Sequence, residues 1–342
     1  MHQPDFNQLL KVLRREKPDR PTLFEFIIGG PVFDKLAGGK LDQAAPAMEK
    51  LRQVIRAFHN GGYDYAVLPS WEFAFVGFPG GGHAEEGSSH SLNEGAVITD
   101  EASFEAYAWQ DVKPEAYAVF GEAADDLPEG MKLIAMSNGG VEENMVELVG
   151  YQDLCFMQID EPELVKQIAD AIGSRLLAHY EEVLKYDTVG AIMVNDDWGF
   201  KTQTMFPPEF LREYVVPWHR KFAEVAHEAG RPVLMHSCGN LREVWDDIID
   251  DIQVDGKHSY EDSIQPVEEA YEEYGSRIAI LGGIDMDFLC RKTPEEIYKR
   301  SAEMIERTDG CTGYALGSGN SIAPYVPVEN YEAMIRAVLE KR

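Results

Sequence analysis

The sequence predicts an α/β fold, a (β/α)8 TIM barrel, because short apolar runs alternate along the chain with amphipathic helical patterns. The runs are apolar throughout and do not alternate with polar residues, which is typical of parallel strands buried on both faces. Eight such runs occur, the number that closes this barrel. They span residues 23–28, 65–68, 133–136, 191–194, 233–236, 252–257, 278–281 and 313–316.

The segments between these runs show the helices that a barrel requires. Residues 162–186 carry apolar side chains at a spacing of three or four, the period of an amphipathic helix, and Asp160 is the expected N-cap. Pro208, Pro294 and Pro327 are expected where three further helices begin, because the first turn of a helix tolerates proline. No G-x-G-x-x-G follows the first run, which disfavours the alternative of an open doubly wound sheet.

The chain is predicted to form one domain over residues 1–342, because barrels routinely use this much chain and no Ser/Pro-rich linker divides it. Residues 71–132, between the second and third runs, predict an elaborated loop that covers the mouth of the barrel as a lid. The Gly-rich part of this loop, residues 77–87, is interpreted as loop and not as a domain boundary.

The charge of the chain excludes several classes of partner. Sixty acidic and 31 basic side chains give a formal charge of -29, which repels nucleic acid and anionic lipid surfaces. The N-terminal residues are polar, and no apolar stretch approaches the roughly 18 residues of a membrane span. We therefore expect a cytoplasmic protein that acts on a small molecule. No oligomeric state is predicted.

The four cysteines do not form a C-x-x-C pair, so the sequence predicts neither a disulfide framework nor a zinc knuckle. Cys155, Cys290 and Cys311 lie in or near predicted helices and are interpreted as packing residues. Cys238 differs because it follows His236 at the end of the fifth run. Residues two apart on an extended chain project to one face, so the imidazole and the thiolate point to a common metal. The alternative is a buried cysteine beside a hydrogen-bonded histidine.

Other polar residues stand at the ends of predicted strands, where barrel enzymes place their catalytic groups. Candidates for a third metal ligand are Glu25, Asp196, Asp197 and Ser318. Asp196 and Asp197 follow the fourth run, where one carboxylate would bind metal or polarise a base; a solvated acidic turn is the alternative. Lys257 and His258 end the sixth run and are candidates for holding an anionic substrate group, with a surface pair as the alternative.

The chain resembles the uroporphyrinogen decarboxylase superfamily in a set of motifs that extends over nearly its whole length. These motifs are residues 14–21, 196–199, 217–218, 236–240, 281–285, 317–320 and 327–330. The superfamily consists of (β/α)8 barrels and holds the decarboxylases of haem synthesis and corrinoid-dependent methyltransferases, so the resemblance implies the same fold.

Departures from the family pattern favour the methyltransferase branch. True decarboxylases have an Arg-rich loop after the first strand and an aspartate after the second, whereas this chain has Ile27-Ile28-Gly29-Gly30 and Ser70-Trp71 there. A polycarboxylate substrate requires several cations, and a site without them repels it. Decarboxylation of uroporphyrinogen is therefore not expected.

The resemblance to the methyltransferase branch implies a zinc site. That branch binds zinc through His-x-Cys, which His236 and Cys238 match, and through a second cysteine near the end of the chain, where this sequence has Ser318. A carboxylate, Glu25 or Asp196, would then complete the site, or the metal is absent. Cofactor contacts are expected from Trp71, Trp198, Asn240 and Asn320. For the two tryptophans, which with Phe73 and Phe75 suggest an aromatic mouth, core packing is the alternative.

The function expected from these observations is a zinc-dependent, O-demethylase-type methyltransferase. It would transfer a methyl group between a small methyl ether or thiol and a corrinoid on a separate partner protein, with Asp196, Asp197, Lys257 and His258 as catalytic candidates. One alternative is a metal-free decarboxylase that holds a carboxylate with Lys257 or His258. Another is a barrel that binds a tetrapyrrole or corrinoid without catalysis.

Overall fold

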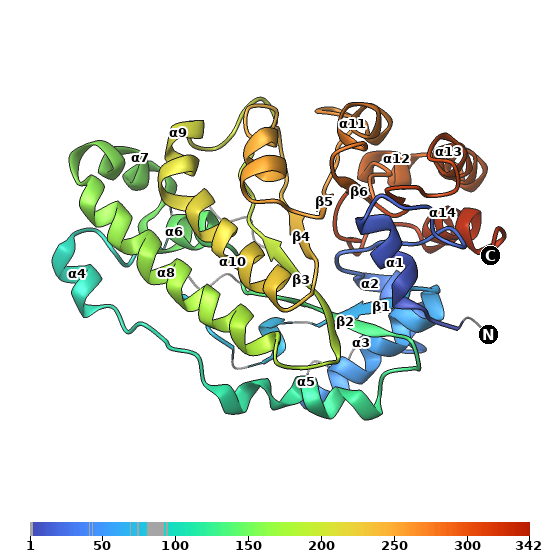
Figure 1. Ribbon diagram of the computed structural model, residues 1–342, viewed down its shortest axis with the longest axis horizontal. Coiled ribbons are helices and arrows are strands. Elements are labelled where there is room, and N and C mark those ends of the chain that lie inside the picture. Colours follow the sequence, from blue (N-terminus) through green and yellow to red (C-terminus); the bar gives the residue numbers. More distant parts are fainter. Residues whose placement is uncertain are drawn as a thin grey trace.

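The computed structural model describes residues 3–40, 42, 44–68, 70–73, 75–80, 92–93 and 95–342. Its centre is a curled, all-parallel sheet in which every strand pairs with the next one along the chain (Figure 1). The described strands are β1 (Tyr65–Val67), β2 (Lys132–Met136), β3 (Val189–Asn195), β4 (Val233–His236), β5 (Gly256–His258), β6 (Ala279–Leu281) and β7 (Tyr314–Ala315). This sequential parallel order is that of a TIM barrel, so the predicted fold class is confirmed.

The first apolar run takes the remaining position beside β7 without forming a regular strand. Leu23 and Leu316 form an isolated parallel bridge, as do Ile28 and Ile322. On the side of β1, the Tyr65 hydroxyl accepts from the Glu25 N–H and donates to the Glu25 carbonyl, each at 2.7 Å. The Tyr65 side chain thus takes the place of backbone hydrogen bonds between the first run and β1. For this reason the first run, predicted as a strand, appears only as isolated bridges.

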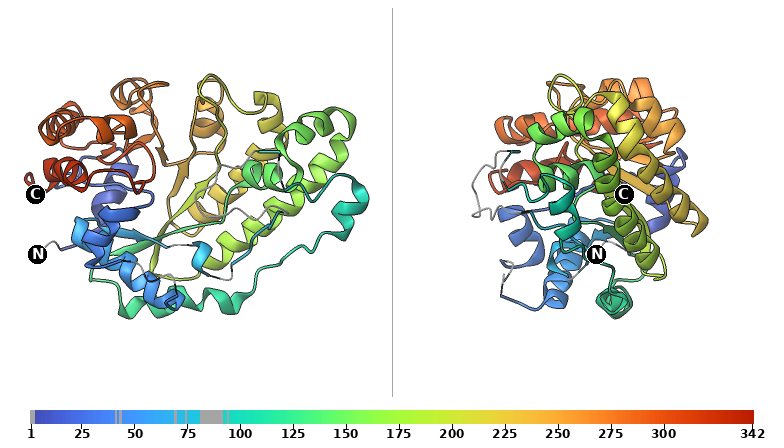
Figure 2. Two further views of the ribbon diagram at one scale, coloured as in Figure 1. Left: turned by 180° about the vertical axis from the view of Figure 1, so that it is seen from behind. Right: turned by 90° about the vertical axis from the view of Figure 1, so that its left-hand side faces the viewer.

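Helices surround the sheet on its outer side (Figures 1 and 2). The α-helices in the described ranges are α1 (Phe6–Leu13), α2 (Gly30–Ala37), α3 (Ala47–Gly61), α4 (Glu101–Ala106), α5 (Ala118–Glu122), α6 (Val141–Val149), α7 (Tyr151–Asp160), α8 (Pro162–Val183), α9 (Pro208–Phe210), α10 (Val216–Glu228), α11 (Val267–Tyr274), α12 (Met286–Arg291), α13 (Pro294–Arg307) and α14 (Val328–Leu339). The three helices expected at prolines begin at Pro208, Pro294 and directly after Pro327.

Two local predictions need correction. Asp160 does not cap α8; it is the last residue of α7, and Glu161 takes the N-cap position without a side-chain hydrogen bond. The sixth apolar run was expected to be extended from residue 252, but β5 begins only at Gly256. The Val254 N–H instead donates to the Ile248 carbonyl at 3.2 Å, so this part of the run continues the preceding helical turn.

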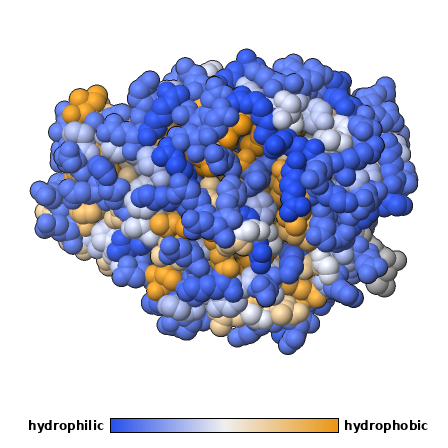
Figure 3. All heavy atoms as spheres, viewed as in Figure 1, coloured by the Kyte–Doolittle hydropathy of each residue, from blue (hydrophilic) through white to orange (hydrophobic). Residues whose placement is uncertain are grey.

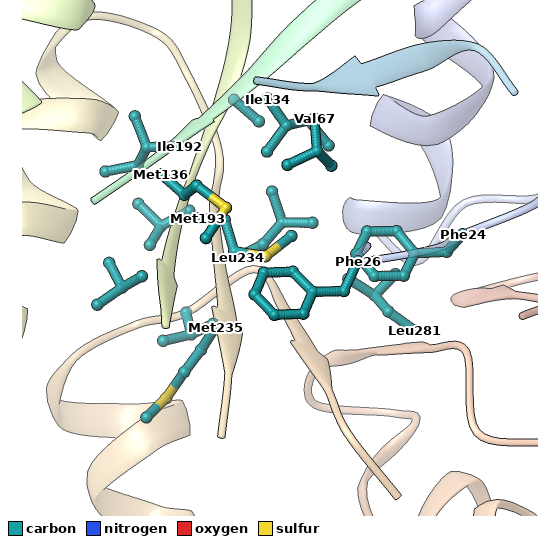
Figure 4. Packing of buried hydrophobic residues seen from close by; sticks show 14 of the residues in the cluster. Phe24, Phe26, Val67, Ile134, Met136, Ile192, Met193, Leu234, Met235 and Leu281 are labelled. Carbon is teal, nitrogen blue, oxygen red and sulfur yellow. The ribbon is translucent and has the colours of Figure 1, made fainter. Parts of the chain in front are cut away.

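The strands enclose a close-packed apolar core, and Figure 4 shows side chains of the first run, β1 to β4 and β6 within it. Phe24 and Phe26 from the first run lie among side chains of β1 to β4 and β6 in this view. Phe24 is fully buried and Phe26 nearly so. The interior is therefore filled, and space for a substrate is found towards the carboxyl ends of the strands.

The elaborated loop after β1 is present, but its part from residue 95 to residue 131 does not lie over the barrel as a lid. Residues 95–131, which include α4 and α5, run along the outside of the molecule beside α8 (Figures 1 and 2). Arg175 of α8 lies over the Trp109 ring at 5.1 Å and pairs with Asp111 at 3.1 Å. Residues 74, 81–91 and 94 of the predicted lid lie outside the described residues.

A buried histidine of α8 connects residues 95–131 to the barrel. His179 of α8 is fully buried; its Nε2 donates to the Met136 carbonyl at 3.2 Å, and its Nδ1 accepts from the Tyr117 hydroxyl at 2.8 Å. The neutral ring makes both contacts, and burial favours this form because it lowers the pKa of His179 from 6.5 to about 4.

This histidine is expected to make stability pH-dependent. Below pH 6.5 the unfolded chain binds a proton that the folded chain binds only near pH 4, so stability falls as the pH drops through this window. The loss is at most about 3 kcal/mol. Urea unfolding at a series of pH values should show it, and His179→Phe should remove this part of the slope. An unchanged slope in that variant would contradict the assignment.

The visible surface agrees with the charge of the sequence: hydrophilic residues cover most of the face in Figure 3, and apolar ones show mainly in its hollows. Within the described residues, no helix has both the length and the apolar character needed to span a membrane.

Candidate metal centre

Asp197, His236 and Cys238 converge at the carboxyl ends of two adjacent strands. Asn195 at the end of β3 pairs in parallel with His236 at the end of β4, so the residues that follow both strands meet. One ligand atom from each of the three side chains lies within 4.8 Å of the others. The His236 Nε2 is 3.5 Å from the Cys238 Sγ and 3.8 Å from an Asp197 oxygen. We call these three residues the metal triad.

Two loops hold the triad together. The Cys238 N–H donates to Asp197 Oδ1 at 2.7 Å, and the Asn240 N–H donates to the Phe200 carbonyl at 2.8 Å. Gly239 has φ of +85°, and a Cβ there would lie 2.1 Å from the Gly199 carbonyl oxygen. Glycine is therefore required for the close approach that brings Cys238 to Asp197.

The surroundings of the triad disfavour the charged form of each of its three side chains. Burial, with the neighbouring Asp197 charge, raises the pKa of the Cys238 thiol to about 12. Burial also raises the pKa of Asp197 and lowers that of His236 well below its usual value. A divalent cation offsets these costs, because it favours the thiolate, the carboxylate and the neutral imidazole together. One nitrogen, one oxygen and one sulfur donor suit zinc, and three protein ligands are typical of catalytic zinc sites.

The outer contacts of the triad come from other strand ends. The Asn320 amide donates to the Cys238 Sγ at 3.1 Å, and the Ser259 hydroxyl lies 3.6 Å from the same sulfur. The Phe26 ring stacks on His236 with centroids 4.1 Å apart. Ser259 and Phe26 could not be predicted from the sequence, because a serine after a strand and an apolar residue in a strand have ordinary structural explanations.

Two cavities are each lined by one residue that contacts the triad. One, of about 550 Å³, has Phe26 in its wall together with Phe33, Phe58 and Trp71. The other, of about 950 Å³, is more polar and has Asn320 in its wall. Both sizes are within the range of small-molecule sites.

Glu25 and Ser318, predicted as metal ligands, bind each other instead. The Ser318 N–H donates to Glu25 Oε1 at 2.9 Å, and the Ser318 Oγ lies 2.5 Å from Oε2. Glu25 is fully buried, and burial raises its pKa to about 8, so it is mainly a neutral acid at pH 7. The structure does not bring Glu25 into the triad, and the expectation that either residue completes the metal site is corrected on this ground.

Asp196 and Asp197 have different surroundings although they are neighbours in sequence. Asp196 is fully buried and accepts from the first three N–H groups of α6, at 2.9, 3.1 and 2.9 Å. The His219 Nε2 lies 2.8 Å from the same carboxylate. Asp196 is thus an anchor for α6, and the expectation that it binds metal or acts in catalysis is corrected; Asp197 takes the position at the triad.

Lys257 and His258 lie behind the triad and not in an open anion site. Lys257 is buried; its ammonium donates to the Ser259 carbonyl at 2.5 Å and lies over the Tyr260 ring at 4.5 Å. Burial lowers its pKa to about 8. The His258 Nδ1 is 2.8 Å from the His236 Nδ1. The expectation that these two residues hold a substrate carboxylate, or form a surface pair, does not match their burial.

The residues expected to contact a cofactor fall into two groups. Trp198 is fully buried against His219, with ring centroids 5.0 Å apart, so it packs in the core and cannot contact a corrin. Asn240 holds the adjoining loop through its amide, which donates to the Thr202 carbonyl at 3.3 Å. Trp71, which is 53% exposed, and Asn320 line the two cavities and remain available to a ligand.

Comparison with known families bears on the resemblance seen in the sequence. Residues 96–340 match the family model for uroporphyrinogen decarboxylase (URO-D). The chain belongs to this family. The match covers more than half of the chain and includes the whole triad, so the predicted family is confirmed.

Relatives of both branches occur. A methylated-thiol--coenzyme M methyltransferase of Methanosarcina mazei is 29% identical over 194 residues, which cover 56% of this chain and 49% of the relative. A uroporphyrinogen decarboxylase of Solibacter usitatus is 27% identical over 155 residues, 44% and 41% of the two chains. This URO-D chain therefore spans about half the length of the curated relatives it matches, or less.

The fold has a full-length counterpart among solved structures. A methyltransferase from Methanosarcina mazei superposes with a TM-score of 0.73 at 18% identity and covers 99% of each chain. At this identity the likeness establishes the fold alone, in agreement with the barrel described above.

Proposed function

We propose that this URO-D protein is a zinc-dependent methyltransferase that moves a methyl group between a small methyl ether or thiol compound and a corrinoid carried by a separate protein. The observation that carries the proposal is the metal triad, which unites nitrogen, oxygen and sulfur donors and is contacted by Phe26 and Asn320 from the walls of two cavities. The methylated-thiol methyltransferase among the relatives supports the reaction class. We propose an O-demethylase-type specificity because the soft ligand expected at Ser318 is replaced by the Asp197 carboxylate.

The residues of the chain have separable tasks in this reaction. Bound at the triad, zinc supplies Lewis acidity towards the heteroatom that loses its methyl group. Asp197, His236 and Cys238 hold the ion, and the aromatic wall of the 550 Å³ cavity provides an apolar surface for a methylated substrate. Phe26, which stacks on the His236 ring, would limit the access of water to this side of the site and so strengthen electrostatic interactions within it.

The experiment is a methyl transfer assay with reduced cobalamin and a panel of methyl ethers and thioethers, followed by the loss of the cob(I)alamin absorbance. We expect turnover by the zinc-loaded protein with at least one substrate, and a fall of more than about 100-fold in His236→Ala. His227→Ala is the control, because His227 is an exposed histidine that pairs with Asp255 at 2.8 Å and does not belong to the triad.

Two results would contradict the proposal. Full activity in His236→Ala would remove the metal from the reaction. Release of carbon dioxide from a carboxylic acid in the presence of a chelator, without methyl transfer, would favour the metal-free decarboxylase.

A further inference from the structure

We propose that His258 is a positioning residue that fixes which ring nitrogen of His236 is free to bind the metal. This role of His258 rests on the proposed metal centre. It adds the tautomer of each histidine ring, which the positions of the three triad residues do not determine. His258 is fully buried, touches none of the space in which a substrate would lie, and contacts His236 directly. Its role is therefore exerted through His236.

The hydrogen positions follow from a chain of three groups. The His258 Nε2 lies 3.0 Å from the Ser318 carbonyl oxygen. A carbonyl can only accept, so this nitrogen carries a hydrogen. In a neutral imidazole the other nitrogen then has a lone pair, and the His258 Nδ1 is an acceptor.

The position of the hydrogen on His236 follows from that on His258. The Nδ1 atoms of His236 and His258 are 2.8 Å apart, a distance that requires one donor and one acceptor. Since the His258 Nδ1 accepts, the His236 Nδ1 must donate and carry the hydrogen. The His236 Nε2 is then unprotonated, and this is the atom that faces Cys238 at 3.5 Å and Asp197 at 3.8 Å. Its lone pair is directed to the metal without any rearrangement.

The opposite arrangement is disfavoured by burial. A hydrogen on the His236 Nε2 would require the His236 Nδ1 to accept, and His258 would then need hydrogens on both of its nitrogens. Such a cation would be fully buried, with only a ring nitrogen and a carbonyl as partners, and beside the ammonium of Lys257. With both histidine rings neutral, no second positive charge is buried beside Lys257.

Neighbouring residues hold the rings of His236 and His258 in the orientation that these hydrogen bonds require. Phe24 and Phe26 pack against His258 with ring centroids 5.3 and 6.1 Å away, and Phe26 also stacks on His236 at 4.1 Å. Gly282 has φ of +70°, and a Cβ there would lie 2.3 Å from the Ser318 carbonyl oxygen and 2.9 Å from the His258 ring. The absence of a side chain at Gly282 therefore leaves room for the contact from which the hydrogen chain starts.

Zinc affinity of purified variants tests the proposal without a substrate. Competition with a chromophoric chelator should give a dissociation constant 10- to 100-fold weaker, roughly, for His258→Phe than for wild type. His258→Asn should restore most of the affinity, because an amide oxygen near the Nδ1 position can accept from His236. His179→Phe is the matched control: it also removes a fully buried histidine that bonds a carbonyl, and its zinc affinity should be unchanged.

A direct measurement on the wild-type protein covers the case in which His258→Phe does not fold. Long-range proton–nitrogen NMR of histidine-labelled, metal-free protein reports the tautomer of each ring. We expect hydrogens on the His236 Nδ1 and the His258 Nε2. A hydrogen on the His236 Nε2, or zinc binding by folded His258→Phe as tight as in wild type, would overturn the proposal.

The NMR result also separates this inference from the proposed function. A protein that binds no zinc but shows the expected tautomers would contradict the metal centre and retain the role of His258. A protein that binds zinc but has the opposite tautomers would retain the metal centre and contradict the role of His258.

Discussion

Asp196→Ala is expected to lower the free energy of unfolding by about 4 kcal/mol, the largest effect on stability that the structure predicts for a single carboxylate. The Asp196 carboxylate accepts the first three N–H groups of α6 and lies 2.8 Å from the His219 Nε2. All of these groups are buried or nearly so, and alanine would leave them without an acceptor.

Urea unfolding of the purified variant measures this loss, and Asp197→Ala provides a neighbour as control. The Asp197 side chain is 38% exposed and accepts one backbone N–H, from Cys238, so its removal should cost only about 1 kcal/mol. Its zinc affinity, however, should fall. Equal losses of stability in the two variants would show that Asp196 is not the anchor of α6.

This pair of residues shows what the sequence could and could not predict. An acidic pair after an apolar run indicates a functional strand end, and one of the two does lie at the triad. Which one depends on the turn after β3 and on the position of α6, more than 50 residues earlier in the chain. Neither is encoded in the local pattern, so the roles of Asp196 and Asp197 remained interchangeable until the fold was known.

The predictions that succeeded rest on periodicity. The parallel strands follow from apolar runs buried on both faces, and the convergence of His236 and Cys238 follows from the period of two along an extended chain. Glu25 lies outside the triad and is bonded to Ser318, which is 293 residues away on the segment that closes the barrel. A charge within a strand indicates a polar partner, but it does not indicate whether the partner is a metal or a backbone N–H.

Trp198 illustrates the same limit for aromatic residues. A tryptophan at a strand end fits an apolar binding site and a packed core equally well, because both remove its ring from water. The structure places the ring against His219, under the loop that carries Asp197, where it is fully buried. Trp71 remains at a cavity because the short helical turn after β1 turns it outward, with 53% of its surface exposed.

Cys238→Ser is expected to weaken zinc binding more than 100-fold, the largest effect predicted for the metal centre. The Cys238 Sγ is the one sulfur donor of the triad, and the Asn320 amide and the Cys238 N–H are already engaged in holding it in place. A serine hydroxyl keeps the shape of the side chain but gives a poor zinc ligand, because it retains its proton at neutral pH.

Plasma emission of dialysed protein measures the bound zinc, and two variants make the result specific. Glu25→Gln should keep the metal, since this carboxyl is neutral and bonded to Ser318 outside the triad. Cys155→Ser removes a half-buried cysteine on α7 and should also keep it. Loss of zinc in Glu25→Gln would restore Glu25 as a ligand and contradict the triad, whereas zinc retained in Cys238→Ser would show that the sulfur does not hold the metal. Loss of zinc in Cys238→Ser with retention in Glu25→Gln would mean that this site holds its metal through the thiolate of Cys238 and without the Glu25 carboxyl.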